Sequence, residues 1–197
     1  MNNLDTFRPR SSIFAAVVAY LVIAIMVIQS FFISDLHGSL VATIWGVFAA
    51  TLSYVILHRP KVELFDEGIR ITNPFDQITV GWQRVESIDA KYTMSIQVGS
   101  KVIYAWAAPA PGRYHSRTIH PSEIKGMDIG IDGLIRPGDS PRTHSGAAAY
   151  LAVMRLKSFR DSGSTNGCQS SVVLNKTALA ILITSCIVGI VLNIYHF

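Results

Sequence analysis

Asp139, Ser140 and His144 are the residue types of a nucleophilic triad, in which histidine removes the proton of the attacking hydroxyl and a carboxylate orients the histidine. All three lie in one six-residue stretch of a segment rich in proline and glycine. A working triad needs its members held by separate rigid elements. We therefore expect no catalysis at these residues.

Metal and cofactor chemistry also lacks a suitable pattern. His115 and His120 have neither a cysteine nor a further histidine at ligand-like spacing on a regular element. Gly99-Ser100-Lys101 reads as a hairpin turn and does not resemble a phosphate-binding loop between a strand and a helix. The sequence predicts no cofactor, no metal and no enzymatic activity.

Basic residues in the Pro/Gly-rich loop 109–144 are the candidates for contact with a lipid surface or a partner. Near anionic headgroups each cation contributes about 1 kcal/mol. The alternative is a solvated loop whose charges have no specific role. The candidate residues are Arg113, Arg117, Lys125, Arg136 and Arg142.

Long apolar runs would hold these basic residues at a membrane. Hydrophobic residues make up 50% of the chain and charged residues 15%, and the apolar residues gather in three runs. A helix needs about 20 residues to cross the hydrocarbon of a bilayer. We predict transmembrane helices at 13–33, 39–58 and 177–197, with an N-terminal tail at 1–12 and a short outside turn at 34–38. The first run is too long for a signal peptide and ends without a small-x-small cleavage site.

Basic residues also predict orientation, because lysine and arginine are retained on the cytoplasmic side. Of 17 such residues, two lie in the N-terminal tail and fifteen between Arg59 and Lys176. The N-terminus and the middle region are therefore expected inside, and the C-terminus outside.

The middle region, 59–160, changes to the alternating pattern of short strands. Turn signals at Asp66-Glu67-Gly68, at Asn73-Pro74-Phe75-Asp76 and at Gly99-Ser100 separate runs with apolar residues at every second position. Gly68 is expected to adopt a positive φ in a three-residue turn. The pattern predicts a small antiparallel barrel or sandwich. Its expected core is Ile69, Ile71, Ile78, Val80, Trp82, Val85, Ile88, Tyr104 and Trp106.

A helix is expected to follow the strands, from Gly146 to about Arg160, capped by Ser145. Ala147, Tyr150, Leu151 and Met154 share its apolar face and would cover an open end of the barrel. Residues 161–176 read as a flexible linker. We expect no disulfide between Cys168 in this linker and Cys186 in the third run.

Two stretches carry a likeness to a known family. "VELFDEGIRITNP" followed by "ITVGWQRVESI" resembles the membrane-anchored bacterial pleckstrin-homology-like (PH-like) family, in which a strand ending in tryptophan is the most recognisable element. Later stretches, "YAWAAPAPGRYHSRTIHPSEIKG" and "IRPGDSPRTHSGAAA", resemble its actinobacterial branch related to a low-molecular-weight antigen. The resemblance implies a bacterial plasma-membrane protein whose seven-stranded barrel or sandwich has one C-terminal capping helix. Its strands would include a pair around 127–135.

One departure from related eukaryotic domains concerns phosphoinositides, which are usually bound by basic residues near the first hairpin. Here that turn is Asp66-Glu67-Gly68, which would repel a phosphate. No phosphoinositide site is therefore expected.

The expected function is a non-enzymatic, membrane-tethered PH-like binding or scaffold module that engages a protein partner or a second copy of itself. The alternative is a sensor of anionic lipid surfaces that uses the basic loop. Nucleic acid is not expected as a partner, and no small-molecule substrate is indicated. The runs 13–33, 40–57 and 178–192 contain no ionisable Asp, Glu, Lys, Arg or His, which disfavours a transporter or channel.

Overall fold

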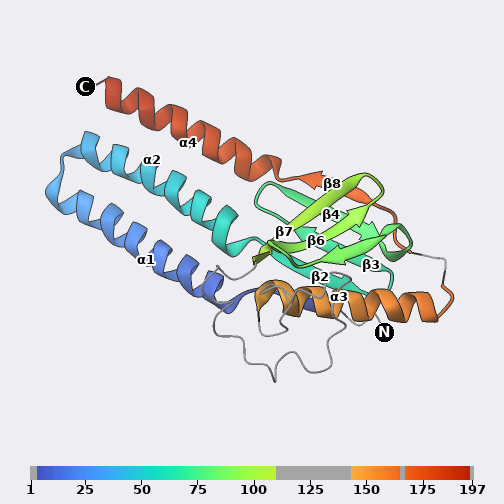
Figure 1. The fold of residues 1–197 in the computed structure, drawn as a ribbon. Coiled ribbons are helices and arrows are strands. Elements are labelled where there is room, and N and C mark those ends of the chain that lie inside the picture. Colours follow the sequence, from blue (N-terminus) through green and yellow to red (C-terminus); the bar gives the residue numbers. More distant parts are fainter. Residues whose placement is uncertain (1–3, 110–142, 165–166, 196–197) are drawn as a thin grey trace. The chain divides into compact units, whose positions relative to one another are not determined.

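The three apolar runs form long helices in the computed structural model, which describes residues 4–109, 143–164 and 167–195. These are α1 (Arg10–Ile33), α2 (Leu36–Ser53), continued by a π-helical turn η1 (Tyr54–His58), and α4 (Lys176–Ile194) (Figure 1). Each helix is long and apolar enough to cross a membrane. They belong to one compact unit, Arg10–Pro60 with Pro74–Asp76 and Leu174–Phe197.

The link between α1 and α2 is shorter than the predicted turn at 34–38. Asp35 caps α2, and its Oδ1 accepts a hydrogen bond of 2.9 Å from the Gly38 N–H. Leu36, His37 and Gly38 therefore form the first turn of the helix. The predicted start at 39 was wrong because the apolar run begins later than the capped helix does.

Small residues allow the helices to pack closely. A Cβ atom on Gly46 of α2 would lie 2.5 Å from Cγ2 of Val27 in α1. A Cβ atom on Gly189 of α4 would lie 3.0 Å from Cε2 of Trp45 in α2. Glycine at these two positions permits the close packing of α2 against both neighbours.

The second compact unit contains Lys61–Asn73 and Gln77–Val173, together with the N-terminal residues up to Pro9. Its first sheet has the order β1-β2-β3-β4-β8, and its second has the order β5-β6-β7. The strands are β1 (Asp5–Phe7), β2 (Lys61–Phe65), β3 (Gly68–Thr72), β4 (Asp76–Gly81), β5 (Ser87–Asp89), β6 (Thr93–Val98), β7 (Lys101–Pro109) and β8 (Ser171–Leu174). A 3-10 turn, η2 (Trp82–Arg84), joins β4 to β5, and α3 (His144–Asp161) packs on both sheets.

Two segments that were predicted to be a tail and a linker form strands of the first sheet. Part of the predicted N-terminal tail is β1, whose Phe7 pairs antiparallel with Val62 of β2. Arg155 of α3 ties β1 down, because its Nε donates to Asp5 Oδ2 at 3.0 Å and its Nη1 to Asp66 Oδ1 at 2.8 Å. The predicted flexible linker contains β8, which lies beside β4.

The hairpins show one correct and one wrong turn prediction. Gly99 has φ +58° in the turn between Val98 and Lys101, as expected for a two-residue turn that starts with glycine. Gly68 does not adopt a positive φ, and it pairs with Phe65 across a two-residue turn. Glycine is needed there for space, because a Cβ atom would lie 2.4 Å from the Val80 carbonyl oxygen and 2.6 Å from Cys168 Sγ.

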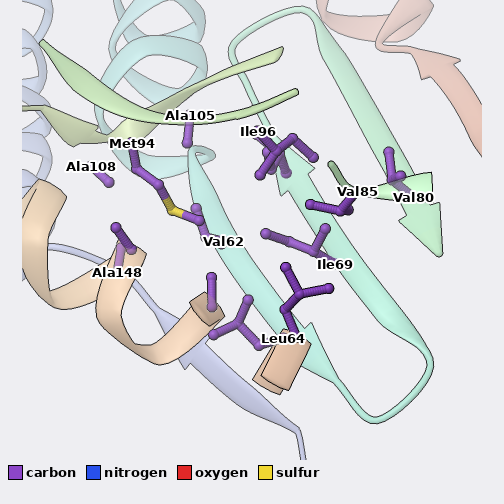
Figure 2. Packing of buried hydrophobic residues seen from close by; sticks show 14 of the residues in the cluster. Val62, Leu64, Ile69, Val80, Val85, Met94, Ile96, Ala105, Ala108 and Ala148 are labelled. Carbon is purple, nitrogen blue, oxygen red and sulfur yellow. The ribbon is translucent and has the colours of Figure 1, made fainter. Parts of the chain in front are cut away.

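The core lies between the two sheets and α3. Side chains of β2, β3 and β6 converge in it, with Ala148 of α3 on the helix side (Figure 2). Trp82 is 1% exposed, and its Nε1–H donates to the Phe65 carbonyl at 2.9 Å. Among the predicted core residues Ile69, Ile71, Val80, Trp82 and Val85 are buried, and Ile78 and Ile88 are partly buried against them.

Tyr104 and Trp106 were wrongly predicted to be core residues, since each is 57% exposed. Alternate residues of β7 point to opposite faces of the sheet, and both of these sets are apolar. Alternation therefore does not reveal which set faces inward. The structure buries the small set, Ala105 with Ala107 and Ala108. These alanines let α3 approach the sheet closely.

In helix α3, too, the buried face differs from the predicted one. Its N-cap is Thr143, whose Oγ1 accepts from the Gly146 N–H at 3.0 Å, and not Ser145. Its buried face is made of Ser145, Gly146, Ala148, Ala149, Ala152, Leu156 and Phe159. The predicted face was wrong, because Tyr150, Leu151 and Met154 are exposed.

Candidate functional site

The binding residues predicted from the sequence lie outside the described residues; they are Arg113, Arg117, Lys125, Arg136 and Arg142. The same holds for His115, His120, Asp139, Ser140 and the strand pair expected around 127–135. His144 is described, and its ring makes an edge contact with Phe7 at a centroid distance of 6.0 Å. Within the described ranges, no group of three or more His, Cys, Asp or Glu side chains is arranged to hold a metal. Among the described residues, the best candidate lies on the β5-β6-β7 sheet.

The outer face of the β5-β6-β7 sheet brings polar and aromatic side chains together. Met94 and Ile96 of β6 point into the core, so Ser95 and Gln97 point to the opposite face. The strand register places Asp89, Ser95 and Tyr104 in one row across the sheet. A second row contains Ser87, Gln97 and Val102.

These two rows form the floor of a hollow of about 250 Å³. The turn between β5 and β6 supplies Lys91 and Tyr92, and Tyr92 is 74% exposed. We call this feature the outer-face hollow. Its full lining is Ser87, Asp89, Lys91, Tyr92, Thr93, Ser95, Gln97, Val102 and Tyr104.

Most polar groups around the outer-face hollow already have partners. The Ser87 hydroxyl bonds to Gln97 Oε1 at 3.2 Å, and Asp89 Oδ1 accepts from the Lys91 backbone N–H at 2.9 Å. Thr93 Oγ1 lies 2.8 Å from the carbonyl oxygens of Ala105 and Ala108. These bonds fix the lining side chains before any ligand arrives.

Ser95 is only 7% exposed, and its hydroxyl forms no hydrogen bond with another described residue. Its Oγ is not among the fully buried side-chain atoms that lack a partner, so it is accessible from the outer-face hollow that the residue lines. A molecule in that hollow can therefore form a hydrogen bond with it.

A distortion of β7 and one asparagine hold the aromatic side chains in place. The register shifts between Thr93 and Ser95, which leaves extra residues on β7 next to Tyr104. Such bulges redirect side chains and are frequent beside functional sites. Asn73 secures the free edge of β7, because its Nδ2 donates to the Tyr104 carbonyl at 3.1 Å and its Oδ1 accepts from the Trp106 N–H at 3.0 Å.

The charges around the outer-face hollow balance. Asp89 contributes one carboxylate and Lys91 one ammonium, whose Nζ lies 5.0 Å from the centroid of the Tyr92 ring. The lining therefore has no excess of positive charge with which to bind a phosphate.

Sequence reasoning missed this site, although part of the signal was present. Ser95 and Gln97 alternate with Met94 and Ile96, so the outward direction of their side chains could be read from the sequence. The contribution of Tyr104 could not, because an aromatic residue in a strand is more often buried.

A second hollow, of about 420 Å³, lies between α2 and α4, both in the helical unit. It is lined by Ala50, Thr51, Tyr54, Asn175, Thr177, Ala178 and Ile181. Its lining contains neither a carboxylate nor a cation, so it offers less polar chemistry than the outer-face hollow.

Cys168 is a free cysteine that is partly buried against the first sheet. Its backbone N–H donates to the Glu67 carbonyl at 3.1 Å, and its Sγ fills the space left by Gly68. Burial, and then the negative charge of Glu67, raise the pKa of the Cys168 thiol above its usual value. A thiol with a raised pKa is a poor nucleophile near neutral pH.

Comparison with known proteins identifies no relative. No protein-family model matches the chain, and no curated protein or solved structure is significantly similar to it. The resemblance to the bacterial PH-like family therefore stays a prediction.

Proposed function

We propose that this protein is a non-enzymatic binding module tethered in a membrane, with the outer-face hollow as its ligand site. Ser95 carries the proposal. Its hydroxyl is accessible at the floor of a hollow and has no hydrogen-bond partner among the described residues, so it can bond to a ligand that enters the hollow.

Binding is favoured over catalysis by the surroundings of the same hydroxyl. A serine nucleophile needs an adjacent base to take its proton. Within the described part of the chain, Ser95 Oγ has no such hydrogen-bonded base.

Three helices able to cross a membrane support the tether. Two of them precede the chain segment that forms most of the sheet unit and one follows it, so in this proposal the unit is attached to the bilayer at both ends. The proposal also retains the PH-like family, the cytoplasmic location of the sheet unit and the bacterial plasma membrane. Their support is the sequence resemblance and the distribution of basic residues.

Photocrosslinking tests whether the outer-face hollow binds anything in the native membrane. A photoreactive phenylalanine analogue replaces Tyr92 or Tyr104 in the full-length protein, and a matched control carries it at Tyr150, which is 55% exposed on α3. We expect a discrete mass adduct at Tyr92 and Tyr104 but not at Tyr150. No adduct at the two hollow positions, or the same adducts at all three positions, would contradict the proposal.

A further inference from the structure

We propose that the ligand of the outer-face hollow is a neutral sugar, an inference that rests on the proposed binding function. In this arrangement the ring of Tyr104 packs against an apolar face of the sugar ring. Asp89, Ser95 and Gln97 form hydrogen bonds with its hydroxyl groups.

Ser95 points to a ligand that carries hydroxyl groups. Its Oγ can donate one hydrogen bond and accept others, so a group that can also do both satisfies it best. Asp89 is its neighbour in the same row, and an ionised carboxylate only accepts hydrogen bonds. Hydroxyl groups on adjacent carbons of a sugar could donate to Asp89 and exchange bonds with Ser95.

The exposed tyrosines indicate that the ligand also has an apolar face. Tyr104 is 57% exposed and lies in the same row as Ser95 and Asp89. A sugar ring combines C–H groups on its faces with hydroxyl groups around its rim, which matches this lining. A purely apolar ligand would leave the Ser95 hydroxyl buried without a partner, at a cost in affinity.

Charge and size restrict the ligand further. The outer-face hollow contains one carboxylate and one ammonium, which does not favour a phosphate or another anion. Its volume of about 250 Å³ is below the roughly 300–1,000 Å³ of sites for drug-sized molecules, so it suits a single ring.

An extended peptide is a poorer match. Peptides that bind sheets usually add a strand to an open edge, where backbone groups are free. The outer-face hollow is centred on β6, which is paired with β5 on one side and with β7 on the other. Recognition there must therefore depend on side chains.

Saturation-transfer NMR on the full-length protein in lipid nanodiscs tests the inference. Nanodiscs avoid detergents with sugar headgroups, which would compete for the site. The probes are the methyl glycosides of glucose, galactose, mannose and N-acetylglucosamine, with inorganic phosphate as an anionic competitor. We expect saturation transfer to at least one glycoside, with no displacement by phosphate.

Two variants and two matched controls assign any binding to the hollow. Ser95→Ala should weaken binding about three- to tenfold, the effect of losing one neutral hydrogen bond. Tyr104→Leu keeps apolar area but loses the flat ring, and should weaken binding by at least about threefold. The controls are Ser171→Ala on β8 and Tyr150→Leu on α3, both exposed, and neither should change the affinity. Circular dichroism of each variant checks that the fold is kept.

The outcomes distinguish a wrong ligand class from a wrong binding site. Absence of transfer to every glycoside, or transfer that Ser95→Ala and Tyr104→Leu leave unchanged, would overturn the sugar inference. If photocrosslinking at Tyr92 and Tyr104 still yields an adduct, the proposed binding function stands with another ligand class. Failure of both experiments rejects both proposals.

Discussion

Single residues decide which aromatic side chains stabilise the sheet unit and which remain available for contact. Trp82 and Trp106 both end alternating apolar runs, yet the first is 1% and the second 57% exposed. The difference arises because alanines, not aromatic residues, fill the inner face of β7.

We predict that Trp82→Ala destabilises the sheet unit by about 3–5 kcal/mol, the cost of removing a large core side chain. The hydrogen bond to the Phe65 carbonyl would be lost with the indole. Trp106→Ala is the matched control and should cost less than about 1 kcal/mol. Thermal unfolding of the full-length variants, followed by circular dichroism, measures the difference. Equal losses would mean that Trp106 is also a core residue.

Cys168 gives a prediction about pH. Because burial and Glu67 raise the pKa of its thiol, the thiolate fraction near pH 8 is lower than that of an ordinary cysteine. Alkylation should therefore accelerate only at more alkaline pH. Glu67→Gln removes a negative charge that disfavours the thiolate, so it should move the rate profile to lower pH.

The measurement is the alkylation rate against pH in a Cys186→Ser background, where Cys168 is the one remaining cysteine. Asp161→Asn, an exposed acidic residue at the end of α3, serves as the control and should leave the profile unchanged. A profile for Glu67→Gln that does not move, or that moves to higher pH, would contradict the stated effect of Glu67.

At the scale of elements, the helices depend on small residues at their contacts. Gly46→Leu and Gly189→Leu should each destabilise the helical unit by about 1–3 kcal/mol, because the added atoms overlap Val27 and Trp45. Ala24→Leu places the same side chain at an exposed position of α1 without this overlap. The midpoint of thermal unfolding, measured for the three variants in nanodiscs, shows which substitutions destabilise the helical unit. Similar shifts for all three would show that helix packing does not depend on the glycines.

At the scale of the whole molecule, the distribution of basic residues predicts orientation. Fifteen of 17 lysines and arginines lie between Arg59 and Lys176, so this region should face the cytoplasm. In a cysteine-free chain expressed in bacteria, Ser34→Cys should react with an impermeant maleimide applied to intact cells. Ser100→Cys, in the turn between β6 and β7, should react only after permeabilisation. The reverse pattern would refute this orientation.

Sequence by itself determined the type of most elements. Uncharged apolar runs of sufficient length gave three helices, because a helix satisfies its own backbone hydrogen bonds whatever surrounds it. Alternation with turn residues gave the strands β2 to β7, and Gly99 gave a turn with positive φ. These features depend on neighbours in the chain.

Tertiary structure alone decided which face of an element is buried and which distant segments pair. Asp5–Phe7 is too short to be recognised as a strand without β2 beside it. Tyr104 and Tyr150 face outward because the alanines of β7 and α3 pack closely, and either face of those elements was apolar enough to be buried. The outer-face hollow has the same origin. Its rows join residues of three strands, and only the register between strands brings Asp89, Ser95 and Tyr104 together.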